Sequence, residues 1–322
     1  MISLDQKILD PHSQVSERMR SLIDTDIIIP TVKNSELVLS ENVKAYGTGG
    51  NKLNQFFRVI KLGRKLQAQN SYNLITTQDP FMTALSALLI RKKELVEIQV
   101  HGDFFSSKYF KNSSFKNYGY YWLARLITLP RADKIRTVGE RVKQSLVKFC
   151  DAQKIKVRPV FFDAQKIQVH VPQKNLKKNF PGFRKYFLYV GRLEKEKNVA
   201  WLIKVFDQYL RDINSNDGLI IAGAGSQKIV LEKVVVKSQR TQSIKFTGWL
   251  TEPLDYLKTA DCVLISSQAE GYGLVAMEAA ALDTKLITTD VGVANYELPP
   301  SEKVMIIPVN DQAAFISALK KA

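Results

Sequence analysis

Short apolar runs alternate along the first half of the chain with stretches whose apolar side chains recur at helical spacing. Leu53, Phe56, Phe57 and Ile60 illustrate the helical spacing, whereas 26–30 is a short apolar run rich in isoleucine. The pattern predicts strands at 26–30, 72–76, 95–100, 134–138 and 156–161, and helices at 51–68, 81–90, 118–129 and 140–149.

The second half repeats this alternation more regularly. The pattern predicts strands at 186–190, 219–222, 243–246, 262–265, 285–288 and 304–308, and helices at 199–209, 227–237, 252–259, 274–282 and 312–320. Repeated strand–helix units favour parallel sheets covered by helices on both faces. We therefore expect an α/β protein with two doubly wound, Rossmann-like domains that face each other across a cleft.

The segment 163–184 interrupts the alternation. It contains Pro172, Pro181 and Gly182 together with several lysines, a composition that is typical of a connection between domains. We expect domains at 1–165 and 185–322, joined by a linker at 166–184.

Composition narrows the class of protein. The chain has 322 residues, of which 45% are hydrophobic and 24% charged, as in ordinary globular proteins. No apolar run approaches the ~20 residues that a membrane-spanning helix needs, and the N-terminus lacks the pattern of a signal peptide. With only two cysteines, Cys150 and Cys262, a cytoplasmic location is the expectation.

The charge is distributed unevenly. Residues 1–180 contain 30 Lys and Arg against 15 Asp and Glu, a net of +15, whereas 181–322 contain 17 against 16, a net of +1. The basic half indicates an anionic partner, which could be nucleic acid, a membrane surface or an acidic substrate.

The most informative motif is SSQAEGYGLVAMEAA at 266–280, between a predicted strand and a predicted helix. Gly271 and Gly273 permit a tight turn and a close approach of the backbone to a ligand. The amide groups at the start of the helix suit a phosphate. Glu270 and Glu278 would accept hydrogen bonds from sugar or ribose hydroxyls, although the same spacing also fits two solvated glutamates.

Two further turns follow predicted strands, at the edge where α/β sheets bind ligands. In GRLEKEKN at 191–198, Arg192 and Lys197 could meet a diphosphate, while Lys195 reads as a solvated surface residue. In AGAGS at 222–226, the Gly-x-Gly is weak evidence alone, because many strand-to-helix turns contain it.

Taken together, the motifs resemble glycosyltransferase family four, the large retaining group with the GT-B fold. The resemblance rests on Gly191-Arg192-Leu193 with Lys197-Asn198, Gly223-Ala224-Gly225, Phe246-Thr247-Gly248, and Glu270-Gly271-Tyr272-Gly273-Leu274 with Glu278-Ala279. It is strong over about 185–290 and looser elsewhere. It implies that 185–322 bind a nucleotide-sugar co-substrate and that 1–165 bind the acceptor, with no cofactor and no metal.

The resemblance also implies individual roles. Arg192 and Lys197 would bind the donor diphosphate, Glu278 the ribose, and Glu270 the transferred sugar. Glycine and backbone positions complete the donor site: Gly191, Gly223, Gly225, the nucleobase-flanking Gly248 and Trp249, and Gly271, Tyr272, Gly273 and Leu274.

His101 is the candidate catalytic residue of the first half. It follows the predicted strand 95–100, where similar enzymes often place a histidine beside the donor sugar. A solvated or structural histidine is the alternative. With Arg192, Lys197 and Glu270 it completes the expected catalytic set.

The chain departs from the family pattern at two places. The stretch 9–13, which we align with the family's Gly-Gly loop, contains no glycine, and the helices that usually return to the first domain are missing after 312–320.

Aromatic and basic residues intermingle at 104–122. Aromatic rings favour the lipid–water interface, and each lysine near an anionic surface adds about 1 kcal/mol. We expect association with the inner face of the cell membrane and an acceptor that is a lipid-linked or cell-surface glycan precursor, as in polysaccharide biosynthesis. These aromatic residues could instead belong to the core of the first domain.

Two other functions stay open. The basic half could bind nucleic acid, although no recognition motif is present, and the chain could be an inactive GT-B partner subunit. We expect a peripheral membrane hexosyltransferase that does not bind nucleic acid.

Overall fold

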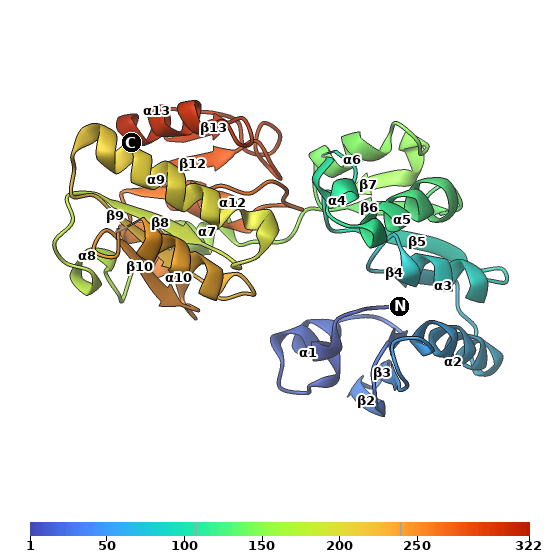
Figure 1. Cartoon of the computed structure of the whole chain (residues 1–322). Helices are drawn as coiled ribbons and strands as arrows, with labels where there is room; N and C mark the ends of the chain where they lie inside the picture. Colours follow the sequence, from blue (N-terminus) through green and yellow to red (C-terminus); the bar gives the residue numbers. More distant parts are fainter. Residues whose placement is uncertain (107, 239) are drawn as a thin grey trace. The chain divides into compact units, whose positions relative to one another are not determined.

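The computed structural model describes residues 1–106, 108–238 and 240–322. The chain forms two compact units (Figure 1). Unit 1 comprises Met1–Val138 and Val142–Arg158, and unit 2 comprises Gly139–Arg141 and Pro159–Ala322.

Unit 1 contains seven of the described strands. Strands β4 to β7 follow one another in parallel, and β1 pairs in parallel with β3. A single residue, Ile2, bridges Ile28 of β1 and Thr77 of β4, and so connects the two groups of strands. The strands are β1 (Thr25–Ile29), β2 (Asn34–Ser40), β3 (Val43–Thr48), β4 (Leu74–Thr77), β5 (Leu95–Val100), β6 (Lys134–Thr137) and β7 (Ile155–Val157).

The hairpin of β2 and β3 departs from the expected all-parallel arrangement, because these two strands pair antiparallel. The sequence pattern missed both strands. In β2 the apolar residues 37–39 are consecutive and only Leu39 is buried. Across a two-residue turn, Val43 and Ala45 are buried and alternate with the more exposed Lys44 and Tyr46, which is the period of a half-buried strand.

The helices of unit 1 connect successive strands. In β4 to β6, Ile75, Val96, Ile98 and Ile135 are buried, whereas their neighbours are more exposed, so one face of these strands carries the core. The helices are α1 (Gln14–Met19), α2 (Gln55–Gln69), α3 (Met82–Ile90), α4 (Lys108–Asn112), α5 (Phe115–Leu123) and α6 (Glu140–Leu146), with 3₁₀ turns η1 (Gln6–Leu9) and η3 (Ala152–Lys154) and the π-helical turn η2 (Ala124–Thr128).

Unit 2 is built on a parallel six-stranded sheet with the order β10-β9-β8-β11-β12-β13. The central strands are buried along almost their whole length, as expected of a parallel sheet covered on both faces. The strands are β8 (Tyr186–Val190), β9 (Gly218–Ala222), β10 (Ile244–Gly248), β11 (Cys262–Ile265), β12 (Leu286–Thr289) and β13 (Val304–Ile307).

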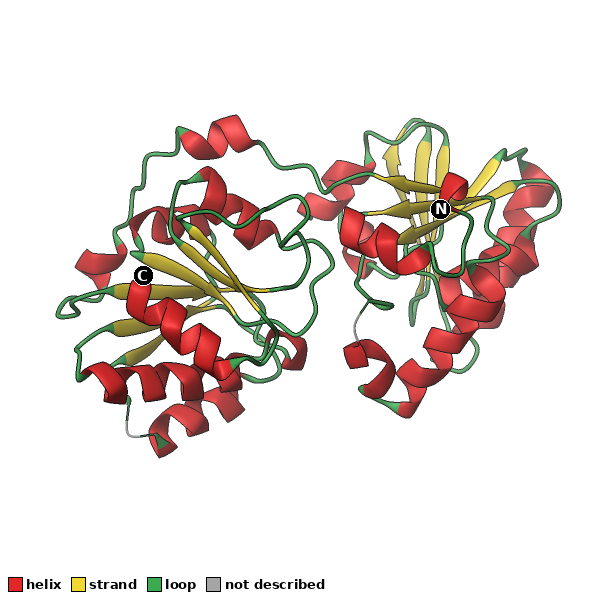
Figure 2. Cartoon of the chain, turned by 90° about the horizontal axis from the view of Figure 1, so that it is seen from above, coloured by secondary structure: helices red, strands yellow, loops and turns green. Residues whose placement is uncertain are grey.

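The strand order reverses between β8 and β11. From β8 the chain winds outward through β9 and β10, then crosses back to β11 and winds the other way. Because such crossovers are right-handed, the helices that connect the strands lie on one face in the first half and on the other face in the second. Figure 2 shows helices on both faces of the sheet. They are α9 (Val199–Ile213), α10 (Lys228–Lys237), α11 (Pro253–Thr259), α12 (Leu274–Ala281) and α13 (Gln312–Lys321), with the 3₁₀ turn η4 (Lys195–Lys197).

The segment expected as a linker, 166–184, lies in unit 2 and contains helical turns. Helix α7 (Ala164–Gln168) extends into it, and α8 (Leu176–Asn179) lies within it. His170 Nε2 lies 2.7 Å from the buried Asp255 carboxylate, which also accepts the backbone N–H groups of Gln173 and Lys174. These bonds fasten the segment to α11.

Several predicted elements are confirmed with identical bounds, namely the strands at 95–100, 186–190 and 262–265. The α/β class with two Rossmann-like domains is confirmed as well. Within the residues that the structure describes, every helix is too short or too polar to cross a membrane.

Candidate active site

A pocket of about 200 Å³ opens at the carboxyl ends of β8 and β11, where the strand order of unit 2 reverses. Ligands of open α/β sheets bind at such reversal points, because the loops after the two strands diverge there. The pocket gathers six of the predicted site residues, namely Gly191, Lys197, Glu270, Tyr272, Gly273 and Leu274.

An ion pair forms the polar part of this pocket. Lys197 Nζ donates to both carboxylate oxygens of Glu270, at 2.6 Å each. The side chains are only 14% and 16% exposed, so water screens the pair weakly. The polar lining is therefore not purely positive, because the Glu270 carboxylate balances the charge of Lys197.

Three buried hydroxyl groups hold the pair in place. Ser267 Oγ donates to Glu270 Oε1 at 2.7 Å, and Thr289 Oγ1 donates to the Ser267 carbonyl at 2.7 Å. Ser266 Oγ donates to the Lys197 carbonyl at 2.8 Å. None of these residues was predicted as part of the site, although Ser267 follows a strand and precedes Glu270 by three residues, a position from which its hydroxyl can reach the carboxylate.

The start of helix α12 faces the same pocket through Gly273 and Leu274. Gly273 has φ +101°, a left-handed conformation that glycine adopts without strain. No side chain of the described residues caps this helix start, so its first amide groups can bind an anion.

Two tyrosines line the pocket as neutral phenols. Burial, and then the charges of Glu270 and Glu196, raise the pKa of Tyr189, whose hydroxyl donates to the Arg192 carbonyl at 3.0 Å. Burial, followed by the charge of Glu297, raises the pKa of Tyr272. Neither phenol is suited to ionise at neutral pH.

Gly223 and Gly225 allow two loops to lie against each other beside the pocket. A Cβ on Gly223 would stand 1.8 Å from the Gly191 carbonyl oxygen, and one on Gly225 would stand 2.4 Å from the Leu193 carbonyl oxygen. The loop after β9 therefore supports the loop after β8 by direct backbone contact, including the bond from Leu193 N–H to the Ala224 carbonyl.

Other predicted donor residues lie outside the pocket lining. Arg192 is 65% exposed and pairs with Glu196 at 3.1 Å. Gly248 ends β10 with φ +74°, and Trp249 after it is 68% exposed. Gly271 lies in the turn before α12.

Glu278 lies on α12, about one turn from its start at Leu274. Burial raises the pKa of its carboxyl group, and no hydrogen bond or ion pair to it is found among the described residues. A half-buried carboxylate without a partner is costly, and a ligand hydroxyl would relieve that cost.

His101 belongs to unit 1, directly after β5. Its Nε2 lies 3.0 Å from Oε1 of the buried Gln99. Desolvation, and then the charge of Arg136, lower the pKa of His101, so its imidazole is neutral at pH 7 and can act as a hydrogen-bonding group. The stretch 9–13, with its absent glycines, forms the turn between η1 and α1.

Metal ligands are not clustered in the described part of the chain, where no group of three His, Cys, Asp or Glu residues could hold an ion. Burial raises the pKa of Cys150 to about 11 and that of Cys262 to about 12. Neither thiol is therefore a reactive nucleophile at neutral pH.

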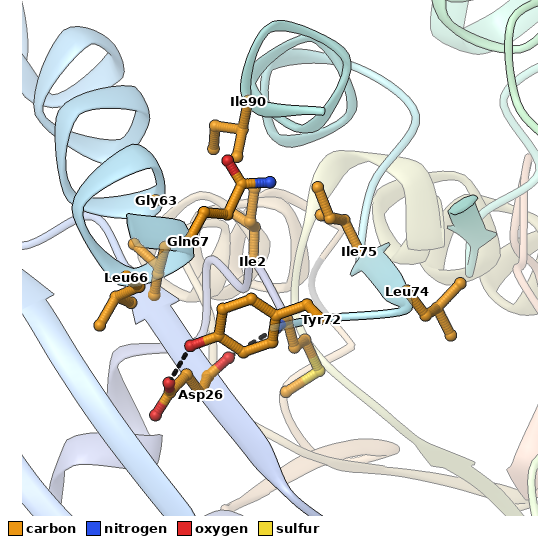
Figure 3. A pocket seen from close by; sticks show the side chains of 11 residues that line it. Ile2, Asp26, Gly63, Leu66, Gln67, Tyr72, Leu74, Ile75 and Ile90 are labelled. Carbon is orange, nitrogen blue, oxygen red and sulfur yellow. Dashed lines mark hydrogen bonds between the residues drawn. The ribbon is translucent and has the colours of Figure 1, made fainter. Parts of the chain in front are cut away.

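A smaller cavity lies in unit 1, between α2 and β4 (Figure 3). Its volume is about 40 Å³, room for about one water molecule. Tyr72 donates a hydrogen bond to Asp26 at its wall, and burial together with that bond raises the pKa of Tyr72 to about 12. Its size excludes a sugar or nucleotide.

Comparison with known proteins finds similarity to glycosyltransferases in the second unit. Residues 172–322 match the family model described as "Glycosyl transferases group 1". Among curated proteins, the chain is 41% identical over 107 residues to the glycogen synthase of Mycobacterium tuberculosis. It is 29% identical over 119 residues to the capsular polysaccharide biosynthesis glycosyltransferase CapH of Staphylococcus aureus.

These alignments cover 33% and 36% of the chain, and 26% and 34% of the two relatives. The matched part therefore spans about a quarter to a third of these curated proteins. Similarity in fold extends further. The crystal structure of Anabaena HepE in complex with UDP superimposes over 99% of this chain and 88% of that one, with a TM-score of 0.70 and 14% sequence identity.

The close backbone contact at Gly223 yields a stability prediction. Gly223→Ala should lower the free energy of unfolding by about 3 kcal/mol or more, because the methyl group collides with the Gly191 carbonyl and φ is +153°. Gly119→Ala is the matched control, since no atom lies within 4 Å of its new methyl group and Gly119 is in helix α5. Alanine there should be neutral or stabilising by up to about 1 kcal/mol. Denaturant unfolding of both variants measures the difference, and equal stabilities would contradict the packing described.

Proposed function

We propose that this protein transfers a sugar from a nucleoside-diphosphate sugar to a glycan acceptor. Residues 172–322 match the family model of the group 1 glycosyl transferases, and the two units have the GT-B fold. The observation that carries this proposal is the pocket at the β8–β11 reversal, where Lys197, Glu270 and the start of α12 converge.

The donor diphosphate is the ligand that this pocket suits best. Amide groups at Gly273 and Leu274 and the Lys197 ammonium would meet the β-phosphate. Negative charge grows on that phosphate as its bond to the sugar breaks. Fixed positive groups lower the barrier when they bind this developing charge more tightly than the ground state.

The remaining donor contacts follow from the free groups around the pocket. Glu278, which lacks a partner among the described residues, would accept hydrogen bonds from the ribose hydroxyls. Trp249, exposed after β10, offers a flat surface for the nucleobase. Arg192 would have to exchange Glu196 for phosphate to take part.

We further propose that the reaction needs no metal ion and retains the configuration of the sugar. The described residues supply no metal cluster, and Lys197 with the helix start provides the charge that a cation provides elsewhere. No side chain of the pocket is an activated nucleophile. Retention would then proceed by attack from the face of the leaving group, with the donor phosphate accepting the acceptor's proton. His101 would bind the transferred sugar.

The surface of unit 1 supports a membrane-proximal acceptor. Phe115 is 99% exposed and Tyr118 48% exposed, and the Lys111 ammonium lies 5.1 Å from the centre of the Trp122 ring. Exposed aromatic side chains among lysines fit an anionic lipid surface. We propose peripheral association with the cytoplasmic face of a membrane and a lipid-linked or cell-surface glycan precursor as acceptor.

Only part of the aromatic segment 104–122 is exposed in this way. Phe104, Phe110 and Tyr120 pack around the buried Phe81, with ring centres 4.8 to 5.3 Å apart. Ser107 lies outside the described residues. The interfacial role therefore belongs to α5 rather than to the whole segment.

Removal of the pocket's cation should slow the reaction, whereas removal of metal ions should not. Lys197→Met should reduce turnover by about 100-fold or more, by analogy with the loss of a donor to a developing anion, and EDTA should leave the unaltered protein active. Lys195→Met, in the same turn but not in the pocket lining, is the matched control. Activity that chelation abolishes and Mg²⁺ or Mn²⁺ restores would refute the proposed mechanism.

The ribose contact can be isolated with deoxynucleotides. Glu278→Gln should weaken binding of the nucleoside diphosphate by about 10-fold or more, because one hydrogen bond to a charged group contributes about 1.5 to 3 kcal/mol. The unaltered protein should lose a similar factor with the 2′-deoxy or 3′-deoxy nucleotide, and the variant should lose little more. Calorimetric titration measures all four affinities. Additive losses would place Glu278 away from the ribose.

Membrane association predicts that the chain binds vesicles containing anionic lipid and that salt weakens this binding. Phe115→Ser should reduce the partition coefficient by at least about fivefold, since it removes a large side chain from the interface. Ile229→Ser on α10, also exposed at 67%, is the matched control and should change little. Equal effects of the two substitutions in vesicle co-sedimentation would argue against docking through α5.

A further inference from the structure

Two charged side chains, Lys197 and Glu270, line the pocket among its described residues. We propose that Glu270 makes the pocket discriminate against the nucleoside diphosphate product in favour of the sugar donor, and so promotes product release. This inference rests on the proposed function, because it assumes that the pocket receives the donor diphosphate.

The two ligands differ in charge at the phosphate beside the sugar. In the donor that phosphate carries one negative charge, because one of its oxygens is bonded to the sugar and another bridges to the neighbouring phosphate. In the product it is a terminal phosphate whose second ionisation has a pKa near 6, so at pH 7 it carries about 1.5 to 2 negative charges. A fixed carboxylate nearby therefore repels the product more strongly than the donor.

Glu270 is held so that it cannot readily turn away from this phosphate. Its Oε1 accepts from the Ser267 hydroxyl at 2.7 Å, and Ser267 is only 1% exposed. The Glu270 side chain itself is 16% exposed, within a pocket wall of low polarity. The carboxylate must then stay in the pocket whichever ligand is bound.

Ligand binding changes the partner of Lys197. In the free pocket its ammonium donates to both oxygens of Glu270 at 2.6 Å. A phosphate that draws this ammonium away leaves the carboxylate short of donors, which is costly in a poorly hydrated site. The sugar of the donor supplies hydroxyl groups that can donate to Glu270 in its place. The bare diphosphate has no such group beside Glu270. Its binding is therefore weakened both by repulsion from the carboxylate and by the carboxylate's loss of hydrogen-bond donors.

The test compares affinities for product and donor in matched variants. Isothermal titration would use UDP, GDP and ADP, each with its glucose ester, against the full chain. Glu270→Gln keeps the shape of the side chain and can still accept from Ser267, but it removes the charge. It should bind the cognate nucleoside diphosphate at least about tenfold more tightly than the unaltered chain does, while affinity for the glucose ester rises much less or falls.

Controls separate this effect from general changes in charge or folding. Glu232→Gln on the exposed face of α10 removes the same charge outside the pocket and should change neither affinity more than about twofold. Lys197→Met should weaken both ligands. Should Glu270→Gln fail to fold, Ser267→Ala, which frees the carboxylate to turn away, should shift the ratio of affinities in the same direction by a smaller factor.

The outcomes distinguish this inference from the proposed function. A folded Glu270→Gln variant that binds the diphosphate no more tightly than the unaltered chain, while both bind nucleotide, overturns the inference alone. If the unaltered chain binds none of the six ligands, the proposed function fails and the inference fails with it.

Discussion

The contact between Lys197 and Glu270 is the interaction on which the site depends. It joins the loop after β8 to the turn before α12, two segments that are 73 residues apart in the chain. A weakly hydrated ion pair is stable only when its geometry is good and its remaining hydrogen-bonding capacity is used. Buried hydroxyls of Ser266 and Ser267 meet that condition, and they bond to the backbone of one partner and to the side chain of the other. The pair is thus assembled before any ligand arrives.

The order of the strands in the sheet of unit 2 determines where the Lys197–Glu270 pair lies. Because the strand order reverses between β8 and β11, the loops after these strands diverge and leave an opening at the carboxyl edge of the sheet. Glycine then decides how closely the loops approach. Gly223 and Gly225 lie where a side chain would collide with the backbone of the loop after β8, and Gly273 adopts a left-handed conformation that directs the start of α12 toward the pocket. The loops after β8 and β9 and the turn before α12 therefore both pack the sheet edge and form the pocket.

Most strands of unit 2 could be predicted from the sequence. Strands that are buried in a parallel sheet are continuous apolar runs, and polar or glycine residues mark where each run ends, as in β8 and β11. The hairpin of β2 and β3 was missed, since only one residue of β2 is buried and its alternation is weak. Motif positions identified Lys197 and Glu270 but not that they pair with each other, which depends on how the strands are ordered in space. Tertiary packing also decides that the Glu278 carboxyl group is partly buried without a hydrogen-bond partner among the described residues. It likewise places the Thr289 hydroxyl within hydrogen-bonding distance of the Ser267 carbonyl.

A crystal structure of the chain with a bound nucleoside diphosphate would show whether Lys197 and the start of α12 bind the donor diphosphate. The β-phosphate should lie within about 3 Å of the Lys197 ammonium and of an amide group at Gly273 or Leu274, with the Lys197–Glu270 bonds lengthened or broken. A nucleotide bound elsewhere, or one bound with the ion pair intact and the α12 amides vacant, would contradict this mode of binding.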